Sequence, residues 1–456
     1  MGLVSLLLGL LAGCNDSVGG GIDKLPDYEE DIDPIVDGGT SDAASEESDA
    51  AAESDGADAA VETDASEEDP ADLTNVPTFA VHLADYGGGA TGVAILDGEA
   101  NVLSERYVST ASTLPGLSAA IAPDMALPSR PCDPKLLTII GRGDDAYVLQ
   151  IDLKKSEVVR QVSTQLGTGE VAYSSNPQDI VCLEHDKALV SRLNPHPKPA
   201  DPLDLGDDLI VLNLEDGSIE RRIDLSDFVP QSDHPEGPTF ARPANLVRVG
   251  NQVVIGLGMF NASYSYYELP GKVLVLSLDT FELTEVPFQN LGNCGTITPV
   301  ADRDDAVLVA CAGNWSPEYA GVAMVRVDED GTGTVLAEFQ SVQGERTLSG
   351  GSLGGATSLG GSRAIVTAQS SDPDVTDAAY VVDLEAGEAT LLFESATSWS
   401  LGAGAIRLET GILLIPDENV GIHVFEMAGN EITELDPIVF GENEIPARRV
   451  VPLRAL

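Results

Sequence analysis

The chain has 456 residues, of which 75 are acidic and 24 are basic, so its formal net charge is −51. A charge of this size and sign repels nucleic-acid phosphates and anionic lipid headgroups, which argues against nucleic acid as a partner. Hydrophobic residues make up 43% of the chain, enough for a large core. The simplest reading of the acidity is that it keeps the protein soluble.

The first fourteen residues read MGLVSLLLGLLAGC. The apolar run is shorter than the roughly 20 residues that a bilayer span needs, but it suits the apolar region of a signal peptide. Leu11-Ala12-Gly13-Cys14 resembles the lipobox of bacterial lipoproteins, although no positive charge precedes the run. The resemblance implies a signal peptide over residues 1–14 and a lipid on Cys14. We therefore expect a cell-envelope protein, in the outer membrane and facing the periplasm or the surface, that meets the membrane through its lipid anchor only.

Residues 15–76 form an acidic segment rich in Ala, Ser and Gly, in which Lys24 is the one basic residue. Such a stretch cannot bury enough apolar surface to offset the entropy cost of ordering, and its charges repel one another. We expect a disordered acidic linker that spaces the following domain from a membrane.

Residues 77–456 show an internal repeat with the period of a β-propeller blade. An apolar run, a polar turn and a second strand-like run recur seven times, and helical periodicity is absent. The sequence therefore predicts an all-β fold, a seven-bladed β-propeller of four-stranded blades. The seven copies, interpreted as outer hairpins, cover 92–109, 147–163, 209–225, 272–288, 322–339, 380–393 and 421–437.

A second hairpin precedes several of these copies and is interpreted as the inner pair of the same blade. The clearest examples cover 179–193, 244–258, 294–312 and 405–416. The first unit has only three strand-like runs, whereas an extra run at 448–453 follows the last unit. We expect this C-terminal run to supply the missing innermost strand of the first blade and so to close the ring.

The repeats resemble the seven-bladed propellers of the YVTN or YncE-like group. The pieces that carry the resemblance are Asn176-Pro177-Gln178-Asp179-Ile180, the run KALVSRLN from Lys187, and LIVLNLEDGSIE from Leu209. Val-Ser stands where the family pattern has Val-Thr, and long insertions separate the hairpins. The resemblance implies the fold and no single activity, because propellers host many unrelated functions.

Four cysteines follow Cys14, and an even count in an exported domain indicates disulfides. Cys294 and Cys311 are expected opposite each other across an inner hairpin, at bridging distance. Cys132 and Cys182 fall near inner strands of adjacent repeats, where a disulfide and free thiols are equally compatible with the sequence. No CxxC pair or nearby histidine favours a metal site, and we predict neither a metal nor another cofactor.

Long insertions at 194–208, 226–243, 260–271, 313–321 and 370–378 are all expected on one face of the disc, where they would serve as binding loops. Aromatic residues make up only 5% of the chain but gather in two neighbouring loops, where they could anchor a partner or pack the loops. The candidate binding residues are Phe260, Tyr264, Tyr266, Tyr267, Trp315 and Tyr319, together with His234 and Arg242.

No HExxH or P-loop motif occurs, and no catalytic residue is assigned. The first hypothesis is a monomeric, non-enzymatic propeller whose loop face binds an envelope protein or a polysaccharide. The second is a propeller enzyme of the lactonase or quinoprotein dehydrogenase type, with its chemistry at the central channel. The third is a structural subunit of an outer-membrane complex.

Overall fold

A computed structural model describes most of the chain after residue 74. The described residues are 75–142, 146–167, 173–184, 186–230, 234–313, 317–343, 346–348, 352–370, 372–441 and 445–454. The predicted signal peptide, Cys14 and the acidic linker lie outside these residues. No helix among the described residues is long and apolar enough to cross a membrane.

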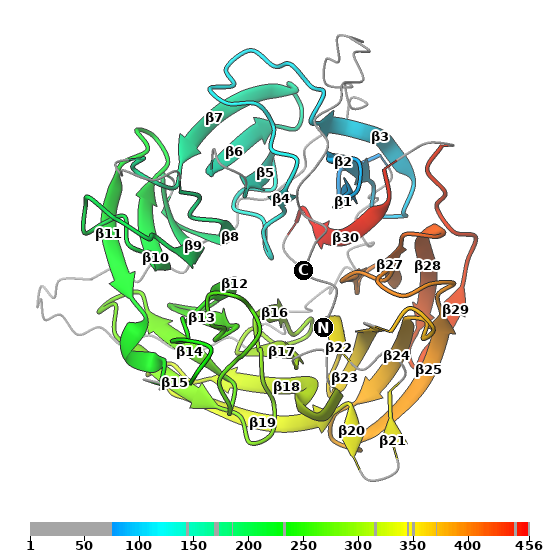
Figure 1. Cartoon of the computed structure of the whole chain (residues 1–456). Helices are drawn as coiled ribbons and strands as arrows, with labels where there is room; N and C mark the ends of the chain where they lie inside the picture. The colour runs from blue at the N-terminus through cyan, green and yellow to red at the C-terminus, as the bar shows by residue number, and fades with distance from the viewer. Residues whose placement is uncertain are drawn as a thin grey trace, which may run out of the picture.

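Seven sheets, each of four antiparallel strands, surround a central axis like the blades of a propeller (Figure 1). This arrangement confirms the predicted fold. Helical structure in the described part of the chain is limited to two short 3-10 turns, η1 (Ser226–Phe228) and η2 (Pro317–Tyr319). A two-stranded ribbon of β20 (Val342–Gln343) and β21 (Arg346–Thr347) lies beside the disc.

Each blade has an innermost strand at the axis and an outermost strand at the rim, and the bounds below run in that order. Blade 1 holds β30 (Ala447–Pro452), β1 (Phe79–Asp85), β2 (Ala90–Leu96) and β3 (Val102–Ser109). Blade 2 holds β4 (Met125–Ala126), β5 (Leu136–Gly141), β6 (Tyr147–Asp152) and β7 (Glu157–Ser163). Blade 3 holds β8 (Pro177–Glu184), β9 (Lys187–Pro195), β10 (Gly206–Asn213) and β11 (Ile219–Asp224).

The remaining four blades follow the same order. Blade 4 holds β12 (Pro243–Val249), β13 (Gln252–Leu257), β14 (Lys272–Ser277) and β15 (Leu283–Pro287). Blade 5 holds β16 (Thr296–Pro299), β17 (Ala306–Ala312), β18 (Ala320–Val327) and β19 (Gly333–Gln340). Blade 6 holds β22 (Ser352–Gly360), β23 (Arg363–Gln369), β24 (Ala378–Asp383) and β25 (Glu388–Glu394). Blade 7 holds β26 (Ala405–Arg407), β27 (Ile412–Asp417), β28 (Gly421–Ala428) and β29 (Glu431–Glu434).

The ring closes in blade 1, where the last strand of the chain pairs with the first. Strand β30 lies antiparallel to β1, with Val81 opposite Val450 and Phe79 opposite Pro452. Figure 1 shows this pairing as a red strand beside the blue strands of the first blade. The closure predicted from the spare run at 448–453 is thereby confirmed.

The antiparallel order of each blade gives the disc two distinct faces. The turns within the inner and outer hairpins lie on one face, which we call the turn face. The connection from the second to the third strand of each blade lies on the opposite face, together with the connection from one blade to the next. We call this side the loop face, and it carries the long insertions singled out in the sequence.

The core lies between neighbouring blades, because both surfaces of each inner strand are covered. Ile140 and Val148 of blade 2 pack with Val190 and Ile210 of blade 3, and all four side chains are fully buried. Full burial of such a side chain stabilises the fold by about 1.5–3 kcal/mol. The outermost strands have one covered surface only, and β7 accordingly alternates between more and less exposed residues.

The described residues contain two disulfides. Cys132–Cys182 joins the β4–β5 connection of blade 2 to β8 of blade 3, and Cys294–Cys311 links the approach to β16 with β17. We expected Cys294 and Cys311 to lie directly opposite each other in the inner hairpin, and this was wrong. Thr296 lies opposite Ala310, so the same register places Cys311 opposite residue 295, one position from Cys294. The disulfides fit an extracytoplasmic location.

Candidate functional site

The aromatic candidates of the loop face gather over blade 4. The rings of Tyr264 and Tyr267 lie 5.6 and 6.0 Å from that of Phe260, centroid to centroid. Tyr264 is 43% exposed and Tyr267 is 7% exposed. Burial raises the pKa of Tyr267 to about 12, with a further contribution from Tyr319 nearby. This group is therefore a packed cluster with one exposed ring.

His234 and Arg242 lie in the connection from β11 to β12, and each contacts a tyrosine of the β13–β14 connection. The imidazole of His234 stacks on the ring of Tyr266, with centroids 3.7 Å apart. Arg242 is buried, lies 4.6 Å below the ring of Tyr264, and donates hydrogen bonds to Leu193 O (3.1 Å) and Asn194 Oδ1 (3.0 Å). Arg242 thus ties the loops of blades 3 and 4 together. Trp315 lies outside the described residues.

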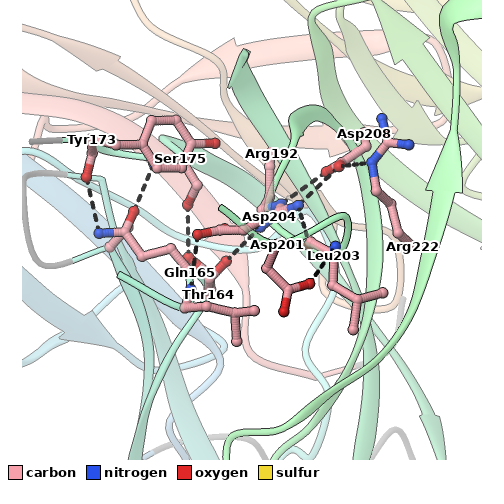
Figure 2. A network of polar contacts seen from close by, with 12 residues as sticks. Thr164, Gln165, Tyr173, Ser175, Arg192, Asp201, Leu203, Asp204, Asp208 and Arg222 are labelled. Carbon is pink, nitrogen blue, oxygen red and sulfur yellow. Dashed lines mark hydrogen bonds and ion pairs between the residues drawn. The ribbon is translucent and has the colours of Figure 1, made fainter. Parts of the chain in front are cut away.

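The long loop of blade 3 is held by the buried ion network of Figure 2. Arg192 has no exposed surface and donates two hydrogen bonds to Asp208, both of 2.8 Å, and one to Asp204 of 2.9 Å. The same guanidinium reaches the carbonyl oxygens of Thr164 and Leu203, and Arg222 contacts Asp208 from the other side. The network fixes the position of this loop instead of leaving it free to adapt.

A cavity of about 470 Å³ opens on the loop face at the central axis. The innermost strands of blades 1, 2, 4, 5 and 6 form its wall, together with loops of blades 1, 6 and 7. The lining residues that carry chemistry are His82, Tyr86, Arg142, Asn245, Gln369, Trp399, Glu418, Arg448 and Arg449. A smaller cavity of about 40 Å³ shares Arg449 and Thr296 with it and continues along the channel.

Three arginines in one cavity are unusual in a chain with only 24 basic residues, and two of the three are neutralised. The Nε of Arg142 donates to Asp124 Oδ1 at 3.0 Å, and its Nη2 forms a second contact with the same carboxylate. The Nη1 of Arg448 donates to Glu418 Oε2 at 2.7 Å. Each of these guanidinium groups already has an acidic partner.

Arg449 differs from the other two arginines. Among the described residues, no carboxylate lies within ion-pair distance of it, and its hydrogen bond runs from Nη2 to Ser129 Oγ at 3.3 Å. The Ser129 hydroxyl donates in turn to the buried carboxylate of Asp179 at 2.5 Å. Burial lowers the pKa of Arg449, whereas Asp179 raises it. Arg449 therefore reaches the carboxylate of Asp179 through Ser129 and forms no direct ion pair with any of the described residues.

His82 lies in the same cavity as a neutral imidazole. Burial lowers its pKa to about 3, and the positive charges of Arg142, Arg449 and Arg448 add to the shift. The hydroxyl of Thr91 donates to Leu83 O at 2.8 Å, so it has no proton left for the 3.2 Å contact with His82 Nε2. Nε2 is therefore the donor, and Nδ1 carries the free lone pair of the ring.

The sequence analysis gave the central channel as the location of the enzyme alternative but named none of the residues that line this cavity. Its residues come from six blades and are far apart in the chain, and none belongs to a local motif. The one local signal was the pair Arg448-Arg449, two of the few basic residues, at the start of the strand that closes the ring. No group of three or more His, Cys, Asp or Glu suited to a metal ion occurs among the described residues.

Comparison with known proteins gives structural matches alone. No protein-family model and no curated protein matches the sequence. A protein from Bacteroides fragilis named as a 6-phosphogluconolactonase matches with a TM-score of 0.52 and 12% identity, over 83% of this chain and 99% of its own. A protein of the same name from Bacteroides uniformis matches with a TM-score of 0.51 and 12% identity, over 83% of this chain and 98% of its own. At this identity the matches show the propeller fold.

Proposed function

We propose that the central cavity of the loop face binds a small organic anion through Arg449. The observation that carries the proposal is that this partly buried guanidinium, unlike those of Arg142 and Arg448, makes no direct ion pair with a carboxylate among the described residues. A cation removed from water without a direct ion pair is less stable than a paired one, and a carboxylate or phosphate of the ligand would supply the missing partner. Guanidinium matches both groups through paired N–H donors. Arg142 and Arg448 add positive potential, although their own carboxylates reduce it.

We further propose that the reaction on the bound anion is lactone hydrolysis. The two structural matches named as 6-phosphogluconolactonases favour this class of reaction. The sequence analysis expects the chemistry of a propeller enzyme at the central channel, where this cavity lies. His82 is the candidate proton acceptor in this cavity, because it stays neutral at physiological pH and keeps a lone pair on Nδ1. Its pKa of about 3 makes it a weak base, and a ligand anion bound at Arg449 would raise that pKa by offsetting the positive charge near the ring. It takes a proton from water as the oxygen attacks the acyl carbon. It returns the proton to the ring oxygen as the acyl C–O bond breaks, which gives a hydroxy acid.

The test compares three variants with the wild-type protein in ligand binding and lactone hydrolysis. Arg449→Gln should weaken the binding of a phosphorylated sugar acid at least tenfold, since a hydrogen bond to a charged group contributes about 1.5–3 kcal/mol. His82→Gln should keep binding and lose most of the turnover. Arg303→Gln is the matched control, because Arg303 pairs with Asp305 in the turn between β16 and β17, on the turn face. Equal binding by Arg449→Gln and wild type would refute the proposal.

A second candidate function, capture of an envelope protein or a polysaccharide on the loop face, is favoured by where the chain enters the disc. The amide of Asn75 donates to Asp97 Oδ2 at 3.0 Å, and Asp97 lies in the β2–β3 turn on the turn face. A linker and lipid at Cys14 would then attach on the side opposite the loops and leave the loop face free for a partner.

Two measurements test this second candidate. Cys14→Ala should abolish incorporation of labelled palmitate and release the protein from membranes. Replacing both Tyr264 and Tyr266 with Ala should abolish capture of a partner from envelope extract. Lipid labelling that persists in Cys14→Ala would refute the anchor, and capture that survives the double replacement would refute the loop-face interface.

A further inference from the structure

Two large aromatic side chains stand exposed at the rim of the arginine cavity. Tyr86 is 60% exposed and Trp399 is 41% exposed, and both line the cavity. Tyr86 lies in the β1–β2 connection and Trp399 in the connection from β25 to β26, so both come from the loop face. In a chain with 5% aromatic residues, two exposed rings at one opening are a feature that packing does not require.

Trp399 is held in place through its backbone. Its φ is +58°, a conformation that glycine or asparagine adopts at lower cost than a bulky residue. The buried carboxylate of Asp377 accepts hydrogen bonds from the amides of Trp399 (3.0 Å), Ser400 (2.8 Å) and Leu401 (3.0 Å). These three hydrogen bonds to one buried carboxylate offset the cost of the strained backbone. They hold the Cα of Trp399 in place at the rim of the cavity.

Arg448 joins the two aromatic residues. Its guanidinium lies 5.3 Å from the ring centroid of Tyr86, and its Nη1 donates to the carbonyl oxygen of Trp399 at 3.2 Å. Its Nε donates to Ala84 O at 3.0 Å, at the end of the strand that leads to Tyr86. Tyr86 and Trp399 therefore have fixed positions beside the cavity that also holds Arg449.

The rest of the cavity wall offers hydrogen-bonding groups to a ligand. Asn245, Gln369 and Glu418 line the cavity together with the arginines. Aromatic rings stack on the apolar faces of cyclic ligands, while amides and carboxylates bind hydroxyl groups at their edges. A hydroxylated ring that carries an anionic group satisfies both sets of residues, whereas a ring-free anion satisfies only the arginine.

We propose that Tyr86 and Trp399 form a stacking subsite that selects ligands in which the anionic group is attached to a sugar ring. This inference rests on the proposed function, because Arg449 must hold the anionic group for the ring to reach the subsite. It adds the two residues that discriminate between anions of equal charge.

The experiment uses Trp399 itself as the probe. The chain has two tryptophans, so the Trp315→Phe variant of the full chain reports on Trp399 alone. Titration with glucose 6-phosphate should change the Trp399 fluorescence and give an affinity about tenfold higher than glycerol 3-phosphate, the size expected for a ring-stacking contact. Tyr86→Ala should lower the affinity for glucose 6-phosphate several-fold and leave that for inorganic phosphate unchanged.

A second variant separates loss of the stacking contact from loss of the folded structure. Trp399→Gly relieves the positive φ, so it should keep the unfolding midpoint and lose the tenfold preference. Phe281→Gly is its matched control, because Phe281 also has a positive φ (59°) and packs on an arginine, Arg221, but lies on the turn face. If glucose 6-phosphate and glycerol 3-phosphate bind equally tightly and Tyr86→Ala has no effect, the stacking subsite is refuted while anion binding at Arg449 is supported. Binding of none of the three phosphates would overturn both.

Discussion

Arg449 on the last strand of the chain donates a hydrogen bond of 3.3 Å to the hydroxyl of Ser129, in the connection between β4 and β5 of blade 2. The Ser129 hydroxyl donates a hydrogen bond to Asp179, whose carboxylate also accepts hydrogen bonds from Asn245 Nδ2 (3.2 Å) and Leu246 N (2.9 Å). The contact thus links the closing strand to blades 2, 3 and 4. It directs the guanidinium toward the axis of the propeller.

Ser129→Ala removes the acceptor that orients Arg449. We predict that the affinity for a phosphorylated ligand falls about three- to tenfold, because the variant keeps the charge of Arg449 and loses one orienting hydrogen bond, and a typical hydrogen bond contributes about 0.5–1.5 kcal/mol net. Isothermal titration calorimetry with the variant and the wild-type protein measures the change. Affinity equal to that of wild type would show that Arg449 needs no support from Ser129.

His82 makes folding stability depend on pH. Its pKa in the folded protein is about 3, against 6.5 for an ordinary histidine, because of burial and the three arginines. Below pH 6.5 the unfolded chain binds a proton that the folded protein does not, so stability falls as the pH drops from 6.5 toward 3. At pH 5 this loss amounts to about 2 kcal/mol.

The His82→Asn variant should lack this loss. Urea unfolding of both proteins at pH 7.5 and at pH 5.0 measures it, and wild type should lose more stability between the two conditions than the variant. An identical loss in both proteins would mean that His82 titrates normally in the fold.

Arg192→Met tests the buried network of Figure 2. The change leaves Asp204 and Asp208 without their shared cation, and both carboxylates are fully buried. Breaking a buried ion pair from one side costs about 3–5 kcal/mol, so the urea midpoint should fall sharply. Arg303→Met, at an exposed ion pair, should cost less than about 1 kcal/mol. Similar midpoints for the two variants would contradict this assignment.

The Cys132–Cys182 disulfide closes a loop with a sequence separation of 50, whereas Cys294–Cys311 spans 17. In the chain-entropy description, the longer loop contributes about 4 kcal/mol and the shorter about 3 kcal/mol. Replacing Cys132 and Cys182 with Ala should therefore lower stability more than replacing Cys294 and Cys311. Denaturant unfolding of the two double variants gives the order, and the reverse order would point to strain or residual structure instead.

The fold was predictable because each blade repeats its own local pattern. The apolar run from Leu209 and the turn at Asp216-Gly217 indicate a hairpin without reference to the rest of the chain. The closure of the ring by β30 was also predictable, because the first repeat has one strand-like run too few and the last repeat is followed by one extra run. The aromatic residues near Tyr264 were found for the same reason, since they are neighbours in sequence.

The cavity could not be predicted in this way. His82, Arg142 and Arg449 come together only when seven sheets close into a ring, and the sequence around each of them resembles that of the other strands and their ends. Nor does the sequence show that Arg142 and Arg448 form direct ion pairs with carboxylates, while Arg449 forms none with the residues that the structure describes. That difference depends on positions in space, and it is the difference on which the proposed function rests.

The central claim is that an anion binds at Arg449. The most direct measurement is a crystal structure of the full chain with 6-phosphogluconate, a phosphorylated sugar acid. The account predicts that a phosphate or carboxylate of the ligand lies within hydrogen-bonding distance of the Arg449 guanidinium, inside the central cavity. The account would be contradicted if the ligand bound to the loops of blade 4 and left the cavity unoccupied. It would also be contradicted if no ligand were bound at a saturating concentration.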